Sequence, residues 1–273
     1  MRPGRAVEGR PGAVPGVRAA AVPPVIDLNR MDGAVFDIDG VVTDTARVHA
    51  AAWKRTFDSV LRRNARRIGK PMKPFDLRAD YLRYVDGRPR LDGLRGFLAA
   101  RGIVLPEGKP TDQPGAFTVY GQARRKDEYF LDRLHRHGVL AFGSTVDLLR
   151  QIRTHGAVTA AVSSSRNAAE VLASAGVTDL FDVRVDGRDA MRMGLAGKPD
   201  PALFIEAARR LGSRPDRLVV VEDALAGVEA GCRGGFGLVV GVDRGSHSAD
   251  LHRAGAHVVV TDLAQLSLRG RRG

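Results

Sequence analysis

The sequence predicts an α/β fold, in which a Rossmann-like parallel sheet carries helices on both faces and an α-helical cap is inserted. From about residue 142 onward, strand-like and helix-like segments alternate, as is typical of a parallel sheet. Polar side chains follow several of the strand-like runs, at the sheet edge where open parallel sheets bind ligands. Between residues 47 and 141 the pattern is helical only. We therefore expect a core formed by residues 31–46 and 142–273, and a cap formed by residues 47–141.

The first half of the chain contains one strand-like run, followed by helices. "AVFDI", residues 34–38, is short and apolar, like a strand that is buried on both faces. Residues 46–63 predict a helix, because His49, Trp53 and Phe57 recur four residues apart. The remaining segments are a basic loop at residues 64–74, "NARRIGKPMKP", and helices at residues 93–103 and 122–138.

The second half repeats a strand and a helix in turn. Its strand-like runs are apolar and short, and its helix-like runs are longer and amphipathic. Strands are expected at residues 157–165, 181–187, 217–224, 237–244 and 257–263, and helices at residues 144–156, 166–176, 200–212 and 225–235.

The first 30 residues read differently from the rest. They are rich in proline, glycine and arginine without periodicity, so we expect residues 1–30 to be a disordered tail. They lack the apolar core of a secretory signal, and no stretch of the chain approaches the roughly 18 apolar residues of a membrane-spanning helix. The single cysteine, Cys232, excludes an internal disulfide framework. We expect a cytoplasmic protein without membrane contact, monomeric or weakly dimeric.

The formal net charge of +12 is concentrated in one segment. Residues 47–141 carry an excess of 11 positive charges, whereas residues 31–46 carry an excess of 4 negative charges. A basic balance can indicate nucleic-acid binding, but the chain lacks an RNP-type aromatic motif, zinc-finger spacing and a clear recognition helix. We therefore expect no nucleic-acid partner and a site for a small phosphorylated ligand.

Two carboxylates lie two residues apart where the first strand ends. Because side chains alternate along a strand, Asp37 and Asp39 can lean the same way, and they would then repel each other unless a cation or a shared proton lies between them. Mg²⁺, a hard cation with oxygen ligands, would provide that charge. Ser163 and Lys198 follow other strands and suit phosphate oxygens. Together these groups suit phosphoryl transfer through an aspartyl-phosphate.

Four segments in order resemble the motifs of the haloacid dehalogenase (HAD) superfamily. They are "DIDGVVTDTA" at residues 37–46, "AVSSS" at 161–165, "GKPDP" at 197–201 and "VVVEDALAGVEAG" at 219–231. Any one of them alone is weak evidence, but four in this order along an α/β pattern are specific. The resemblance covers residues 32–46 and 142–265 well and implies a HAD-like core with an inserted cap.

The resemblance also implies roles for the matching residues. Asp37 matches the nucleophile and Asp39 the general acid/base, while Ser163 and Lys198 match the phosphate-binding residues. The implied Mg²⁺ ligands are Asp37, Asp39 through its backbone carbonyl, Glu222 and Asp223. Asn167 matches an additional phosphate contact. For Ser164, Ser165 and Arg166, phosphate contact and helix capping are both open interpretations.

Part of the cap is similar to that of β-phosphoglucomutases. "TDTARVHAAAWKRTF" includes His49, which in that family lies at the hinge and is linked to positioning of the acid/base; packing is the alternative for His49 and the preferred role for Trp53. Arg90 and Lys126 match the cap residues that hold the distal phosphate of a sugar bisphosphate, with Arg88 as a competitor of Arg90. A solvated basic surface is the alternative for this segment.

Three functions follow as hypotheses. The first is a β-phosphoglucomutase-like isomerase of carbohydrate metabolism, which converts β-glucose 1-phosphate to glucose 6-phosphate through the 1,6-bisphosphate. The second is a HAD-type phosphatase, a hydrolase in which Asp39 activates water to hydrolyse a small phosphate monoester. The third, a catalytically silent binding module, is disfavoured by the intact site residues. Pro89 and the loops at 64–74 and 108–117 depart from the family's cap pattern, which leaves the sugar and the mutase step open.

Overall fold

The computed structural model describes residues 23–245 and 247–271. The predicted disordered tail therefore lies mostly outside the described residues. Within the described residues, no helix is both long enough and apolar enough to cross a membrane.

The core is a six-stranded parallel sheet, as the sequence predicts, with the strand order β4-β3-β2-β5-β6-β7. Its central strand β2 pairs with β3 on one side and β5 on the other, so that Val35 lies between Ala160 and Val220. The strands are β2 (Gly33–Asp37), β3 (Val158–Val162), β4 (Val183–Val185), β5 (Leu218–Glu222), β6 (Leu238–Val242) and β7 (Val258–Val260).

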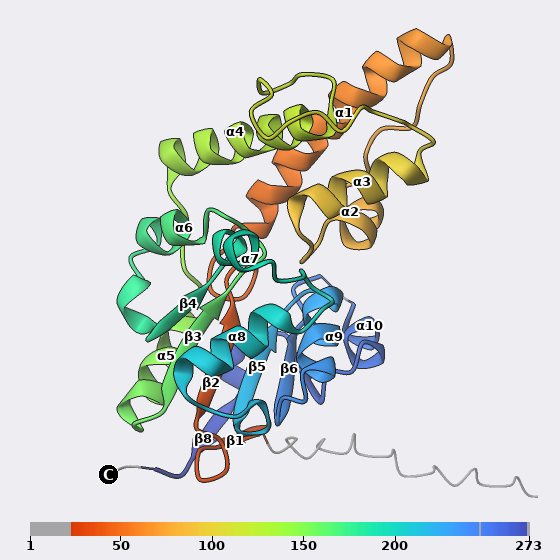
Figure 1. The fold of residues 1–273 in the computed structure, drawn as a ribbon. Helices are drawn as coiled ribbons and strands as arrows, with labels where there is room; N and C mark the ends of the chain where they lie inside the picture. Colours follow the sequence, from red (N-terminus) through yellow and green to blue (C-terminus); the bar gives the residue numbers. More distant parts are fainter. Residues whose placement is uncertain (1–22, 246, 272–273) are drawn as a thin grey trace, which may run out of the picture.

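Helices cover both faces of this sheet (Figure 1). Phe36 packs into the apolar cluster under α5 (Gly143–Thr154) and α6 (Ala168–Ser174), whereas its neighbour Val35 packs into the cluster on the opposite face. Period-two alternation along β2 thus feeds two separate cores. The second face carries α8 (Ala202–Leu211), α9 (Leu225–Arg233) and α10 (Ser248–Arg253), and the shorter elements are α7 (Gly187–Met193), η1 (Thr178–Leu180), η2 (Pro215–Arg217) and η3 (Leu263–Gln265).

Four helices stand beyond the carboxyl ends of the strands and have an apolar cluster of their own (Figure 1). They are α1 (Ala46–Ile68), α2 (Ala79–Tyr84), α3 (Arg90–Ala100) and α4 (Val119–His137). Phe57 of α1 stacks on Phe75 and packs against Phe97 of α3, with ring centroids 4.9 and 4.1 Å apart. This aromatic cluster holds the helices together independently of the sheet.

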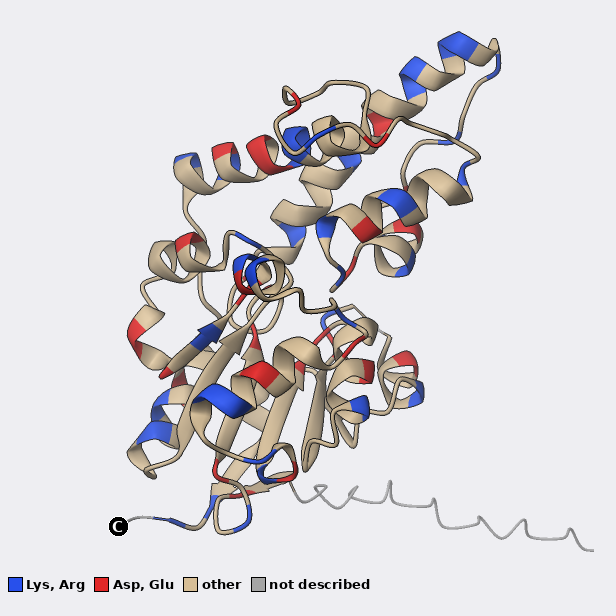
Figure 2. Cartoon of the chain, in the orientation of Figure 1, with Lys and Arg blue, Asp and Glu red and all other residues tan. Residues whose placement is uncertain are grey.

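The predicted basic loop at residues 64–74 is wrong in its first part, because α1 continues to Ile68. Asn64 is buried, and alanine and arginine are good helix formers, so the helix extends to Gly69, which ends it with a left-handed φ of 69°. Lysine and arginine residues are frequent along this projecting end of α1, which is coloured blue over much of its length in Figure 2.

The tail prediction is also wrong at its last residues. β1 (Val25–Asp27) pairs in parallel with β8 (Ser267–Arg269) and forms a separate two-stranded sheet at the end of the molecule opposite the cap (Figure 1). Ile26 and Leu28 are buried in the same apolar cluster as Phe36. The proline and arginine content of the tail masked these two apolar anchors.

Replacing Ile26 with alanine should therefore destabilise the whole core, although it lies in the segment that the sequence assigns to the tail. Ile26 is 1% exposed, and the truncation leaves a cavity, so we expect the free energy of unfolding to fall by about 2–4 kcal/mol in urea titrations. Val25→Ala is the matched control in the same strand, since Val25 is 43% exposed, and its loss should stay below about 1 kcal/mol. Equal, small effects of the two changes would contradict this packing.

Candidate active site

The polar residues predicted at the strand ends meet at one edge of the sheet. Asp37 is the last residue of β2, Glu222 the last residue of β5, and Ser163 directly follows β3. Because β2 lies between β3 and β5, all three loops open at the same place. Asp37, Ser163, Glu222 and Asp223 are all buried there.

Glycines make room for two of these acids. Gly40 has a φ of +94°, and a Cβ built on it would lie 1.8 Å from Oδ2 of Asp223. A Cβ on Gly227 would lie 1.7 Å from Oε1 of Glu222. The glycine after "DID" is thus required both by the left-handed backbone and by the approach of Asp223.

Lys198 is the cation at the centre of the site. Its Nζ contacts Oδ1 of Asp37 and lies 2.5 Å from Oε1 of Glu222, and the side chain is wholly buried. Burial disfavours the charged form, but Asp37 and Glu222 outweigh burial and raise the pKa of Lys198. The lysine therefore stays protonated and bridges the ends of β2 and β5.

Asp37, Glu222 and Asp223 could hold a metal ion, since each offers an oxygen within 4.8 Å of the others. Burial, and then the neighbouring acids, raise the pKa values of Asp37 and Asp223 well above the ordinary range, which indicates a deficit of positive charge. Oxygen ligands of this kind fit a hard divalent cation. Both oxygens of Glu222 are already engaged, because Oε2 accepts a hydrogen bond from the Ala224 amide at 2.8 Å. Asp37 and Asp223 therefore have the freer oxygens.

The Asp39 carboxylate is not part of this group and has its own partners. It accepts hydrogen bonds from Oγ1 of Thr45 at 2.5 Å and Oγ of Ser163 at 3.0 Å, and Nε2 of His49 lies 3.2 Å from its Oδ1. Burial raises the pKa of Asp39, but His49, Thr45 and Ser163 more than compensate and lower it. Asp37 and Asp39 thus differ in protonation tendency although they are two residues apart.

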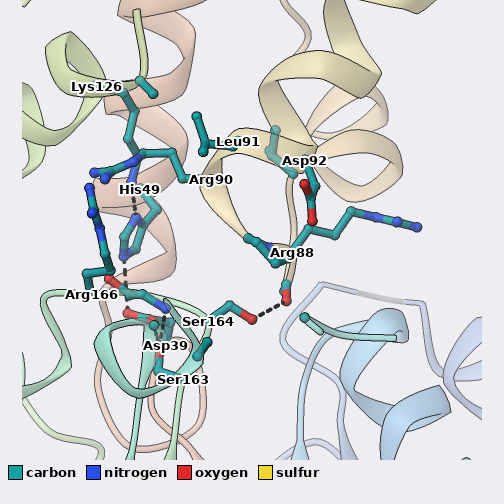
Figure 3. Close-up of a pocket in the computed structure, with 18 of the residues that line it drawn as sticks. Asp39, His49, Arg88, Arg90, Leu91, Asp92, Lys126, Ser163, Ser164 and Arg166 are labelled. Carbon is teal, nitrogen blue, oxygen red and sulfur yellow. Dashed lines mark hydrogen bonds and ion pairs between the residues drawn. The ribbon is translucent and has the colours of Figure 1, made fainter. Parts of the chain in front are cut away.

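A chain of contacts continues from Asp39 into the cap (Figure 3). Nδ1 of His49 lies 2.6 Å from Nζ of Lys126, and the imidazole stacks on Phe130 at 4.1 Å between ring centroids. Burial, with the nearby Arg90, lowers the pKa of Lys126 to about 7. The predicted residues His49 and Lys126 therefore meet, and both line the cavity.

Arg90 and Asn167 meet through an acid that the sequence reading missed. Arg90 forms an ion pair with Asp127, and Nδ2 of Asn167 donates to Oδ1 of Asp127 at 2.8 Å. Burial lowers the pKa of Arg166, and the nearby charge of Arg90 lowers it further. Arg88, the alternative to Arg90, is exposed and points away from His49 in Figure 3.

The serines after β3 divide their roles. Ser164 donates to the Gly87 carbonyl of the cap at 2.9 Å, while Oγ of Ser165 accepts from the Asn167 amide at 3.2 Å. Ser164 thus bridges core and cap, and Ser165 stabilises the turn into α6. Neither of these two contacts involves Asp37, Glu222 or Asp223.

Core and cap together enclose a cavity of about 490 Å³. Asp37, Asp39, Ser163 and Asp223 line its floor, and His49, Arg90 and Lys126 line the cap side. The sequence reading missed the cap residues Asp86 and Tyr81, which also line it. The sequence offered no specific signal for Asp86, since Asp92 and Glu107 also precede a glycine in this segment.

The pKa of Lys126 generates a test by pH. Above about pH 7 the folded state holds Lys126 neutral, whereas the unfolded chain stays protonated up to the ordinary value of 10.5, so unfolding takes up a proton and the free energy of unfolding rises with pH. Lys126→Met removes this dependence. Between pH 7 and 9, the wild type should gain up to about 1.4 kcal/mol per pH unit relative to the variant, measured by urea titration.

Lys70→Met, at an exposed lysine, is the matched control, and its stability curve should run parallel to that of the wild type. A wild-type curve parallel to that of Lys126→Met would show that Lys126 is not held neutral in the fold.

The chain is similar in sequence to a known family and to several characterised proteins. A family model described as haloacid dehalogenase-like hydrolase matches residues 31–235. The chain is 45% identical over 240 residues to a β-phosphoglucomutase of Mycobacterium bovis, covering 87% of this chain and 92% of the relative. It is 32% identical over 243 residues to a validoxylamine A 7'-phosphate phosphatase of Streptomyces hygroscopicus subsp. limoneus, covering 85% and 94%.

Solved structures with a similar fold include a β-phosphoglucomutase. A crystal structure of β-phosphoglucomutase from Clostridium difficile superposes with a TM-score of 0.65 at 24% identity, over 86% of this chain and 92% of that chain. The fold, the acid cluster and the sequence matches lead to one conclusion: the chain belongs to the haloacid dehalogenase-like hydrolase family, among its phosphomutase and phosphatase enzymes.

Proposed function

We propose that this enzyme transfers a phosphoryl group on a sugar phosphate through a phosphorylated Asp37, as a Mg²⁺-dependent β-phosphoglucomutase-like isomerase. The observation that carries the proposal is the contrast between two adjacent carboxylates. Asp37 lies beside Lys198 and among metal-binding acids, whereas Asp39 is held as a carboxylate by Thr45, Ser163 and His49. One is placed to take the phosphoryl group and the other to move a proton.

The roles follow from the positions. A carboxylate oxygen of Asp37 forms the bond to phosphorus while the bond from phosphorus to the ester oxygen breaks, and Asp39 protonates that oxygen as it leaves. In the second half, the acceptor hydroxyl gives its proton to Asp39 as its oxygen takes the phosphoryl group from Asp37. In the catalytic cycle this transfer to the acceptor comes first, because Asp37 is already phosphorylated between turnovers. The lowered pKa of Asp39 suits it, because Asp39 must then act as a base.

Asp37 and Asp223, with Glu222 and the backbone carbonyl of Asp39, would hold Mg²⁺. When bound, the cation offsets the repulsion between the acids and neutralises charge that develops on the phosphoryl oxygens. Lys198 is placed to supply a second positive charge there, and the Ser163 hydroxyl a hydrogen bond.

The cap supports a ligand with two anionic ends. Arg90 of the cap and Arg166 of the core lie close together, and Asp127 is the acid between cap and core that pairs with Arg90. Lys126, with a pKa of about 7, would gain its proton beside a bound dianion. Arg90 and Lys126 of the cap, with Arg166 of the core near Arg90, would bind the phosphate that does not react. Asn167 and Ser164 orient the arginines and the cap loop.

The relative named β-phosphoglucomutase supports β-glucose 1-phosphate as the substrate, with glucose 6-phosphate as the product through the 1,6-bisphosphate. Transfer from Asp37 to the 6-hydroxyl forms the bisphosphate, which returns its 1-phosphoryl group to Asp37. The relative named as a phosphatase supports the second function, in which water replaces the sugar hydroxyl. The single Cys232 fits the reducing cytoplasm as the site of the reaction, and we propose a monomer or weak dimer.

One assay separates the two functions. With β-glucose 1-phosphate, Mg²⁺ and a trace of bisphosphate, we expect glucose 6-phosphate to form without a matching release of inorganic phosphate. Asp37→Asn should lower the rate by at least about 10³-fold, and Asp39→Asn by about 10²–10⁴-fold. Release of phosphate without isomerisation would establish the phosphatase instead, and turnover that survives Asp37→Asn would refute the covalent mechanism.

The distal site has its own test. Arg90→Gln and Arg166→Gln should each raise KM for β-glucose 1-phosphate by about 10- to 100-fold. Its 1-phosphate occupies the distal site while phosphorylated Asp37 reacts with the 6-hydroxyl, and the variants lose a charge-assisted contact to that phosphate. The rate at which acetyl phosphate phosphorylates Asp37 should change less than about twofold, because its only phosphate is the one that reacts.

Arg62→Gln is the matched control, since Arg62 is an exposed cap arginine that does not line the cavity, and it should leave both reactions unchanged. Equal losses on both substrates would show that the arginines act through the fold rather than through the distal phosphate.

A further inference from the structure

The cap loop between α2 and α3 touches the core at three of its catalytic loops. The Gly87 carbonyl accepts from Ser164, and a Cβ built on Gly87 would lie 2.8 Å from Cβ of Ala224, directly after Asp223. A Cβ on Gly197, beside Lys198, would lie 2.0 Å from the ring of Pro89. This loop therefore lies against the core loops that carry Ser163, Lys198 and Asp223.

The same loop carries Asp86, which lines the same cavity as Asp37, Asp39 and Asp223. Burial, together with the negative charges of Glu222 and Asp39, raises the pKa of Asp86 to about 7. The positive charge of Lys198 opposes this shift. Asp86 in turn is the strongest of the neighbouring charges that act on Asp223. Tyr81, one turn earlier in α2, gives the Asp86 side chain a hydrogen bond.

Among the residues that act on Asp86, Tyr81 and Lys198 stabilise its charged form. Lys198 is already shared between Asp37 and Glu222. A phosphate group of a substrate would be repelled by Asp86, so the residue faces either a cation or a neutral part of the ligand. Its neighbours are the metal acids rather than the cap cations, which favours the cation.

We propose that Asp86 is a cap-borne acid of the metal centre, so that a divalent cation held by Asp37 and Asp223 also draws the cap onto the core. Without the cation, Asp86 is repelled by Asp39, Glu222 and Asp223, and closure is opposed. With the cation, the same charge favours closure. Because such coupling is reciprocal, closing the cap also tightens the binding of the cation. The inference rests on the metal site of the proposed function and not on the identity of the sugar.

Binding of Mg²⁺ to the whole protein without substrate tests this directly. Asp86→Asn keeps the size and the hydrogen bond to Tyr81 but removes the charge, and we expect the dissociation constant for Mg²⁺, measured by calorimetry, to rise about tenfold. Asp92→Asn is the matched control. Asp92 also lines the cavity from the cap, but it pairs with Arg95 at 3.4 Å, so the dissociation constant should change less than about twofold.

Hydrogen exchange of the backbone amides at residues 81–90 provides the second measurement. In the wild type, Mg²⁺ should slow exchange in this loop. In Asp86→Asn, exchange without Mg²⁺ should already be slower than in the wild type, because the repulsion is gone, and Mg²⁺ should change it little. Thermal melting verifies that both variants fold.

Three outcomes would overturn the inference. Unchanged Mg²⁺ affinity and unchanged Mg²⁺-dependent exchange in Asp86→Asn would refute it while leaving the proposed function intact. A raised KM for β-glucose 1-phosphate with unchanged Mg²⁺ affinity would instead assign Asp86 to a sugar hydroxyl. A wild type that binds no divalent cation would refute the metal site itself, and this inference with it.

Discussion

The structure depends on the concentration of buried carboxylates at the carboxyl ends of β2 and β5. Asp37, Glu222 and Asp223 lie within a few ångströms of one another, with Asp39 beside them and Lys198 in contact with two of the acids. Such a group is strongly unfavourable unless positive charge is supplied. The local chemistry is arranged around that need. Gly40 and Gly227 give the acids room, and the Ala224 amide donates to Glu222.

The same constraint explains why two neighbouring aspartates behave differently. Asp39 accepts hydrogen bonds from Thr45, just before α1, and from Ser163, just after β3, and His49 of α1 lies 3.2 Å away. Asp37 stays in the cluster, where burial and like charge raise its pKa. A nucleophile and a proton carrier can therefore be made from the same residue type, because the surroundings set their pKa values apart.

Charge is divided between the two parts of the molecule. The core contributes the acidic floor of the cavity, and the cap contributes Arg90, Lys126 and the basic excess of residues 47–141. This division suits the proposed ligand, which carries a phosphate at each end. Asp127 and Asp86 are exceptions on the cap side. Asp127 pairs with Arg90, and Asp86 is the acid that we propose to couple the cap to a bound cation.

The sequence by itself determined the parallel α/β fold and the motif residues at its strand ends. Strand and helix periods are local properties, and the carboxyl ends of parallel strands must lie at one edge, so Asp37, Ser163 and Glu222 were bound to meet. Sequence also indicated His49, Arg90 and Lys126, through the resemblance of the cap. It misjudged Val25–Asp27 and Asn64–Ile68, because composition there outweighed the buried anchors Ile26 and Asn64.

Only the tertiary structure decided which polar groups pair across the two parts. The contacts of Asp127 with Asn167 and of Ser164 with Gly87 join segments 40 or more residues apart, and the charge of Asp86 acts on Asp223 across the same boundary. The depressed pKa of Lys126 likewise comes from burial and from Arg90, neither of which its own helix reveals. Periodicity describes how a segment folds, whereas pairing and desolvation depend on what the rest of the chain places against it.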